Sequence, residues 1–426
     1  MSGYNSEISG FYKYSIKKRR GILSKLIKLD EADMRLLENL GYFTENQIDA
    51  IIENVIGSYQ LPLGIACNFK INNKDYLIPM VIEEPSVVAA ASNAARFARK
   101  HGGFYSEEVK SVMISQIQIT QLPDIKTAKN KIIDKKYQLL KIANEQDPFL
   151  NELGGGAFDF ELRELKTRKG DMLILHLLVD VLDAMGANVV NTMAEAISPY
   201  VEEISGGKVY LRIVSNLATH RIAKSKATFD KNLLGGTDVV EGMLNAYEFA
   251  LADPFRATTH NKGIMNGIVA LTLATGNDTR AIEAGAHAYA ALKGQYSPLT
   301  NYQLTSDGNL IGEIEIPLAL GIIGGMTKIH PMARLALKIL NVKSANELSQ
   351  VAAALGLAQN VAALRALASE GIQKGHMALH SKNIARLAGV PENLIEKVAN
   401  QLIKDKKIRI DYANEILKRI LNNENI

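Results

Sequence analysis

The chain has 426 residues, of which 47% are hydrophobic and 22% charged, and this length and composition are typical of a globular protein with about two or three domains. Its formal net charge of +4 is too small to indicate a nucleic-acid partner. Acidic residues interrupt the apolar runs and the first residues lack the layout of a signal peptide, so we expect a soluble, cytoplasmic protein with no membrane partner.

Neither the single cysteine nor the main basic cluster indicates a catalytic site. Cys67 is the only cysteine, which excludes an intramolecular disulfide and a cysteine-rich metal site. Its apolar surroundings, LGIACNF, predict a small core residue and not a thiol nucleophile. The cluster KKRR at residues 17–20 is expected to form a solvated helix face.

The first distinctive predicted element is the helix that follows EEPS at residues 83–86. Pro85 suits a first helical position, because its missing N–H would go unpaired there. The small residues that follow allow close packing, and the tail RFARKHGG places basic residues in the last turn with glycines after them. On this pattern alone, Glu83 and Glu84 are acids that complement the helix dipole.

Residues 111–214 alternate between strand and helix patterns. The predicted order is strand 111–120, helix 125–146, strands 158–162 and 172–182, helix 189–204 and strand 208–214. This β-α-β-β-α-β order is that of the ferredoxin-like arrangement. We therefore expect a compact small domain at residues 110–218, inserted into a larger one.

The segments on both sides of this module are rich in Ala and Gly and have helical patterns. Residues 1–109 and 219–372 are therefore expected to form one discontinuous, mainly helical domain. Residues 373–426 are helical and basic and are set apart by glycines, which predicts a third, small domain. The expected fold class is α+β.

Two further segments place polar residues where a plain core would not need them. In DPFRATTHNKGIMNG, residues 253–267, the polar residues include Arg256, Lys262 and Asn266. Asp278 follows a turn signal in ATGND and precedes a helix of small residues, so in isolation it is explained as a helix N-cap.

Two other segments are candidate ligand sites. His376 and His380 in GHMALH are one helical turn apart, but the Glu of an HExxH motif is missing and no third ligand is apparent, so we expect no metal. In DAMGANVVNTMAEA, residues 183–196, a strand runs into glycine and small residues and then into a helix. The backbone N–H groups at that helix start, around Gly186 and Ala187, suit a phosphate group.

Together these segments resemble 3-hydroxy-3-methylglutaryl-coenzyme A reductase (HMG-CoA reductase) of the soluble class II type. The resemblance runs over nearly the whole chain, and its motifs are ENVIGSYQLPLGIACNF, VIEEPSVVAAAS, DAMGANVVNTMAEA, THNKGIMNG, ATGND, GLAQN and GHMALH. It implies a reversible four-electron reduction of HMG-CoA to mevalonate and free CoA with two NAD(P)H, on a cofactor domain that is not of the Rossmann type. It also implies a homodimer with the active site at the subunit interface, and larger assemblies such as a hexamer.

The motif match implies four catalytic residues. Lys262 would polarise the thioester carbonyl and hold the oxyanion that forms there. Glu84 would donate a proton to the intermediate aldehyde, and Asp278 would link it to Lys262 and tune both. His376 would protonate the CoA thiolate, carried by a mobile C-terminal flap.

The resemblance also implies binding residues. Arg256 would bind the free carboxylate of the hydroxymethylglutaryl group. The other implied substrate contacts are Ser86, Asn266, Gln359 and Asn360, and the implied cofactor contacts are Asp183, Met185, Gly186, Ala187, Asn188 and Asn216. The family's basic contact to CoA is not matched cleanly, because Tyr12 stands where Arg is expected; Lys13 or the cluster at 17–20 would substitute.

Asp147, at the end of the first predicted helix of the small domain, bears on cofactor choice. An Asp accepts a hydrogen bond from a ribose 2′-OH and repels a 2′-phosphate, which favours NADH. The alternative is a helix-end Asp before proline that binds no ligand. An NADPH-preferring or dual-cofactor version of the enzyme stays open, as does, more remotely, a non-catalytic acyl-CoA-binding protein. Gly371 and Gly375 are the expected hinges of the flap.

Overall fold

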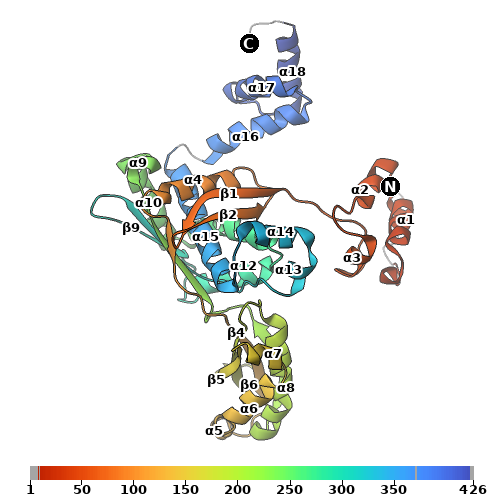
Figure 1. Cartoon of the computed structure of the whole chain (residues 1–426), viewed down its shortest axis with the longest axis vertical. Helices are drawn as coiled ribbons and strands as arrows, with labels where there is room; N and C mark the ends of the chain where they lie inside the picture. Colours follow the sequence, from red (N-terminus) through yellow and green to blue (C-terminus); the bar gives the residue numbers. More distant parts are fainter. Residues whose placement is uncertain (1–7, 9, 370–371, 423–426) are drawn as a thin grey trace. The chain divides into compact units, whose positions relative to one another are not determined.

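The structure, a computed structural model, describes residues 8, 10–369 and 372–422, the side chains of 372–379 excepted (Figure 1). The chain divides into two compact units, Met1–Pro62 and Leu63–Ile426. The sequence pattern instead grouped residues 1–109 in one piece of the large domain. The division after Pro62 follows from a separate small core in the first unit, made by Ile16, Ile48 and Val55.

The first unit contains η1 (Phe11–Lys13), α1 (Ile16–Ile27), α2 (Glu31–Glu38) and α3 (Glu45–Asp49). Its basic cluster is not a solvated face throughout, because Arg19 and Arg20 are buried. Arg19 donates to the carbonyls of Phe11, Tyr12 and Val55 and pairs with Asp49, and Arg20 donates to the carbonyl of Ile56 and pairs with Glu45. Both arginines therefore hold this unit together, and Lys17 and Lys18 are the exposed members of the cluster.

The second unit is built on a six-stranded sheet in the order β2-β1-β3-β8-β10-β9. The strands are β1 (Leu63–Ile71), β2 (Lys74–Val81), β3 (Phe104–Ser106), β8 (Ile222–Phe229), β9 (Thr300–Leu304) and β10 (Leu310–Pro317). The pairings are antiparallel except for β1 with β3. This sheet was not among the predicted elements, but its presence beside the helices confirms the α+β class. Cys67 is exposed on β1, so the prediction of a core cysteine is wrong.

The helices of this unit pack around one long helix, α15 (Ala345–Ala368). Its neighbours include α4 (Val87–Arg99), α10 (Thr237–Ala252) and α11 (Pro254–Ala274), together with β8 and β10. By length and composition α15 is the one helix of the described residues that could cross a membrane, so the expectation that acids interrupt every long apolar run is wrong. Of its apolar stretch 67% is buried within the protein, as in the core helix of a globular domain.

The predicted ferredoxin-like module is confirmed. It contains β4 (Val112–Thr120), α5 (Ile125–Asp134), α6 (Lys136–Asn144), α7 (Pro148–Glu152), β5 (Gly156–Thr167), β6 (Gly170–Asp180), α8 (Ala187–Ser205) and β7 (Lys208–Ser215). The antiparallel sheet has the order β5-β6-β4-β7. The one predicted helix over 125–146 is interrupted at Lys135, whose backbone leaves the helical region.

The remaining helices complete the second unit. They are α9 (Lys231–Leu234), α12 (Thr279–Ala290), α13 (Gly325–Ile329), α14 (Pro331–Leu340), α16 (Ile372–Leu387), α17 (Glu392–Lys404) and α18 (Ile410–Leu421). The last three share a small core of their own around Val390, Val398 and Ile416. Residues 373–426 thus contain the helical segment that the sequence predicts there.

Candidate active site

Glu84 and Lys262 form an ion pair at the surface of the second unit. Lys262 Nζ lies 2.8 Å from Glu84 Oε2, although the two residues are 178 positions apart. They meet because α11, which carries Lys262, packs against β2 and α4, and Glu84 lies in the turn between these two elements. The side chain of Lys262 is 59% exposed and that of Glu84 32% exposed, so both can reach a ligand.

The turn at Glu84 has a strained backbone. Ser86 precedes α4 with φ 73°, a left-handed conformation that is uncommon outside glycine. Its side chain makes no capping hydrogen bond to the start of α4. The helix begins at Val87, so the prediction of Pro85 as its first residue is wrong. Glu84 is therefore turned toward Lys262 and is not a first-turn acid of α4.

A closed ring of hydrogen bonds lies beneath Lys262. His260 Nε2 lies 2.6 Å from Thr300 Oγ1, and the Thr300 hydroxyl donates to Asn360 Oδ1 at 3.3 Å. Asn360 Nδ2 donates back to the carbonyl of His260 at 3.0 Å. Because the Thr300 proton points to Asn360, we assign the His260 tautomer with its proton on Nε2. Tyr302 also donates to Asn360, so this ring fixes α11 to α15 and β9.

Burial keeps the His260 imidazole of this ring uncharged. His260 is 1% exposed, and desolvation, with the Arg256 cation adding to it, lowers its pKa to about 3. The imidazole is therefore neutral at physiological pH. The neighbouring Asn261 is fully buried, donates to the carbonyl of Ser297 and accepts from the N–H of Leu299. His260 and Asn261 hold the helix, and Lys262 alone of the three is exposed.

Two of the implied substrate residues are accessible to a ligand and two are buried. Asn266 lies one turn after Lys262 on α11 and is half-buried. Burial lowers the pKa of Arg256, whose guanidinium has no hydrogen-bond or ion-pair partner in the described part of the chain and is free to bind a carboxylate. By contrast, Gln359 and Asn360 are buried in α15. The amide of Asn360 is held by the ring, whereas Gln359 Oε1 is buried without a partner.

Asp278 is the N-cap of α12. Its Oδ1 accepts from the N–H groups of Arg280 and Ala281, and its Oδ2 lies 3.0 Å from the Arg280 guanidinium. Within the described residues the carboxylate contacts neither Lys262 nor Glu84, so the predicted link between them is not made in this structure. The local explanation, a helix cap, is the one that the geometry matches.

His376 belongs to α16 by its backbone, but its side chain lies outside the described residues, as does Gly371. Its role as the acid for the thiolate therefore stays a prediction. In the part of the chain that the structure describes, no group of three or more His, Cys, Asp or Glu side chains could hold a metal ion.

A cavity of about 920 Å³ lies beside several implied cofactor residues. Asp147, Leu182, Asp183 and Val189 line it, along with Phe149 and Ile323. Its volume lies within the range of cofactor pockets, about 300–1,000 Å³. Asp147 caps α7 through a hydrogen bond from the N–H of Leu150 to Oδ1, which leaves Oδ2 available to a ligand.

The turn that leads from this cavity into α8 fits a phosphate group. Gly186 has φ 102°, and a Cβ there would come within 2.7 Å of Val181 Cγ1, so glycine is required. The N–H groups that open the 19-residue helix α8 are unpaired within the helix and carry its positive dipole end. Asn188 is exposed in this first turn. The residues present therefore fit a dinucleotide.

Asn216 connects this region to α12. It is exposed, and its carbonyl oxygen would lie 2.5 Å from a Cβ on Gly285 of α12. The helix that Asp278 caps therefore packs directly against the backbone of an implied cofactor residue.

The comparisons with known proteins agree over the whole chain. A family model described as hydroxymethylglutaryl-coenzyme A reductase matches residues 15–381. The 3-hydroxy-3-methylglutaryl-coenzyme A reductase of Archaeoglobus fulgidus is 56% identical over 98% of this chain and 95% of its own. The chain belongs to the HMG-CoA reductase family. A probable HMG-CoA reductase of Borreliella burgdorferi is 36% identical over 100% of this chain and 98% of its own.

Solved structures place the chain in class II of the HMG-CoA reductases. The Streptococcus pneumoniae enzyme has a TM-score of 0.76 at 39% identity, over 97% of this chain and 99% of that chain. A second structure of that enzyme, described as class II and bound to NADPH in open conformations, also gives 0.76 at 39% identity and covers 96% of this chain and 100% of that chain. Family membership confirms the predicted reaction, reduction of HMG-CoA in mevalonate metabolism with a nicotinamide cofactor.

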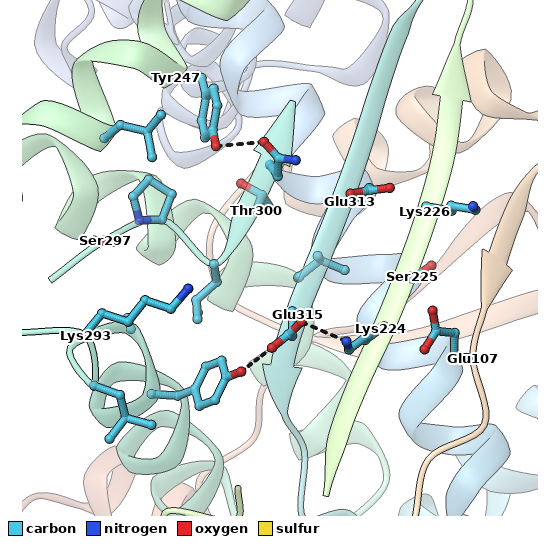
Figure 2. A pocket seen from close by; sticks show the side chains of 18 of the residues that line it. Glu107, Lys224, Ser225, Lys226, Tyr247, Lys293, Ser297, Thr300, Glu313 and Glu315 are labelled. Atoms are coloured by element: carbon cyan, nitrogen blue, oxygen red, sulfur yellow. Dashed lines mark hydrogen bonds and ion pairs between the residues drawn. The ribbon is translucent and has the colours of Figure 1, made fainter. Parts of the chain in front are cut away.

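A second cavity, of about 760 Å³, contains none of the residues implied for the HMG-CoA reductase site (Figure 2). It lies on the outer face of the sheet, where Lys224 of β8 is ion-paired with Glu315 of β10 at 3.0 Å (Figure 2). Thr300, which also lines it, belongs to the hydrogen-bonded ring beneath Lys262.

Proposed function

We propose that the chain reduces HMG-CoA to mevalonate and free CoA with two equivalents of NADH, using Lys262 and Glu84 as its central catalytic pair. The observation that carries this assignment is the 2.8 Å contact between Lys262 Nζ and Glu84 Oε2 at a half-exposed site. The ammonium donates to the thioester oxygen, where negative charge develops, and the neighbouring carboxyl group supplies or takes up the proton of that oxygen. The bound nicotinamide supplies the hydride.

The binding residues orient the substrate on this pair. The free guanidinium of Arg256 binds the terminal carboxylate by a charge-assisted, forked hydrogen bond. Ser86, just before α4, and Asn266, on α11, follow the two members of the pair in the chain, and their polar groups complete the substrate contacts. His376 protonates the departing CoA thiolate, with α16 as its carrier. Asp278, which the resemblance links to this pair, contacts Arg280 in this structure.

We assign the cofactor to the cavity lined by Asp147 and Asp183 and to the turn at Gly186. The free Oδ2 of Asp147 supports NADH, since a carboxylate accepts from a ribose 2′-OH and repels a 2′-phosphate. The NADPH bound to the Streptococcus pneumoniae enzyme supports the second candidate, a dual or NADPH-preferring enzyme.

The active enzyme is proposed to be a cytoplasmic homodimer whose active site lies at the subunit interface. A dimer by light scattering would agree with this assignment. An active monomer would contradict it.

The test of the reaction is nicotinamide absorbance with HMG-CoA, comparing NADH and NADPH at equal concentration. Rapid oxidation of NADH alone supports the full assignment, and faster oxidation of NADPH removes the role of Asp147 as selector. The matched control for Lys262→Ala is Lys129→Ala, because Lys129 forms a comparable 2.9 Å pair with Glu164 in the small domain. HMG-CoA binding without any oxidation, in folded protein, would point to a non-catalytic acyl-CoA-binding protein.

A further inference from the structure

A buried arginine holds the turn that carries the cofactor residues. Arg221, just before β8, is 0% exposed. Its Nη1 donates to the carbonyls of Ala184 at 3.1 Å and Met185 at 3.3 Å, and its Nη2 donates to the carbonyl of Leu320. We call residues 182–186 the cofactor loop and residues 318–323 the strap. One guanidinium therefore bridges the cofactor loop and the strap.

The strap lies directly against the cofactor loop. The N–H of Ile322 donates to the carbonyl of Asp183 at 2.9 Å, and Ile323 forms a parallel bridge with Ala184. A Cβ on Gly321 would come within 2.5 Å of the Met185 nitrogen and 2.9 Å of the Ala184 carbonyl carbon. No side chain fits between the two segments, so the backbone of the loop follows that of the strap.

The strap is also fixed to the turn that carries Asp278. The N–H of Gly321 donates to Asn277 Oδ1 at 2.8 Å, and Asn277 Nδ2 donates to the carbonyl of Gly321 at 3.0 Å. The same amide donates to Thr275 Oγ1 at 3.0 Å. Asn277 immediately precedes Asp278. A reciprocal amide pair thus joins the catalytic turn to the segment on which the cofactor loop rests.

We propose that Arg221, Asn277 and Gly321 are positioning residues that set the cofactor loop relative to the catalytic turn. The proposal rests on the proposed function, which assigns the cofactor to Gly186 and its neighbours. The strap transmits position because its own backbone atoms make each of these contacts, with the cofactor loop, with Arg221 and with Asn277. Displacing it by an ångström moves the N–H groups at the start of α8 away from the phosphate that they bind.

The chemistry at Arg221 requires a guanidinium. Its planar fork donates from two separate nitrogens to three carbonyls, whereas a lysine ammonium has all its donors on one nitrogen. Burial lowers the pKa of Arg221 to about 10, opposed by Asp180 and Asp183, so the side chain stays charged at neutral pH. Its Nε is buried with no hydrogen-bond partner, although a buried unpaired donor is costly.

The experiment compares Asn277→Ala and Gly321→Ala with wild-type protein. The matched control is Asn72→Ala, because Asn72, in the turn just after β1, makes the same reciprocal amide pair with Ser106 of β3, at 2.9 and 3.0 Å. NADH and NADPH affinity is measured by equilibrium dialysis, HMG-CoA affinity by calorimetry, and amide exchange at Ile322 and Ala187 by mass spectrometry or NMR.

We expect Asn277→Ala and Gly321→Ala, which we call the strap variants, to weaken nucleotide binding about ten-fold or more. Their affinity for HMG-CoA should change less than about three-fold. Amide exchange at Ile322 should speed up in the free protein, and nucleotide should no longer slow it. Arg221→Lys should show the same selective loss. The control variant, Asn72→Ala, should be less stable than wild type but should bind nucleotide with unchanged affinity.

Two results would overturn the proposal. If the strap variants bind nucleotide as wild type does while Gly186→Ala loses binding, the cofactor site stands and the positioning role is wrong. If Gly186→Ala also keeps full nucleotide affinity, the cofactor assignment itself is wrong, and the positioning role fails with it.

Discussion

The buried ring beneath Lys262 makes a quantitative prediction about stability and pH. His260 is neutral in the folded protein because burial lowers its pKa to about 3, whereas in the unfolded chain it has the ordinary value of about 6.5. Below pH 6.5 the unfolded state binds a proton that the folded state does not, so stability falls as the pH drops from 6.5 toward 3. Between pH 7 and pH 5 this one group lowers the free energy of unfolding by about 2 kcal/mol.

The variant His260→Gln removes the titrating group and keeps a donor for Thr300. It should lose stability at pH 7, yet its free energy of unfolding should fall by about 2 kcal/mol less than that of wild type on going to pH 5. The measurement is native-state hydrogen exchange of the slowest amides of α11 and α15, since these helices are joined by the ring.

Thr300→Val separates titration from packing. It breaks the contact with Nε2 but leaves His260 buried, so it should be less stable at both pH values with the wild-type pH dependence retained. If the free energy of unfolding of His260→Gln falls between pH 7 and pH 5 as much as that of wild type, the reasoning from burial is refuted.

The remaining predictions concern the proposed active site and the stability of the protein at low pH. Lys262→Ala should lower kcat by about 10²–10³-fold, as loss of an oxyanion donor does, while Lys129→Ala leaves it unchanged in the same absorbance assay. Asp147→Ala should weaken NADH binding and reduce the preference over NADPH, measured as the ratio of the two kcat/KM values; an unchanged ratio contradicts the selector role. The contact with Lys100 and the N-cap bonds lower the pKa of Asp230 to about 2, so its contribution to stability should persist down to about pH 4 and be lost as the pH falls toward 2. In Asp230→Asn, the free energy of unfolding should fall less between pH 4 and pH 2 than it does in wild type. A fall as steep as that of wild type would contradict this prediction.

The small domain could be predicted from the sequence because its patterns are local and strong. β6 is an almost continuous apolar run, and α8 has a clear helical period. The type of each element can therefore be predicted from its own residues. The break at Lys135 was not predictable, because no Gly or Pro marks it. The six-stranded sheet was missed for another reason. Lys224 and Lys226 alternate with small buried residues on β8, and the partner strands come from distant parts of the chain.

The identities of the site residues come from the resemblance and stay predictions, and their contacts could not be read from the sequence. Motif resemblance pointed to Glu84 and Lys262, but no periodicity joins residues 178 apart, and only the packing of α11 on β2 brings them together. For Asp278 the local rule for helix caps described the structure better than the long-range link. Arg221 and Asn277 were missed, because an arginine before an alternating strand is usually exposed and nothing in the sequence marks its burial.

The insertion of one domain into another has a consequence for biosynthesis. The small sheet lies wholly within residues 112–215, whereas β3 at 104–106 finds its antiparallel partner only at 225–227. As the chain leaves the ribosome, we expect the small domain to fold first, while β1, β2 and β3 still present an open sheet edge. A chain interrupted before β8 would thus display a folded small domain beside an unpaired, aggregation-prone edge of β3 and would lack Lys262.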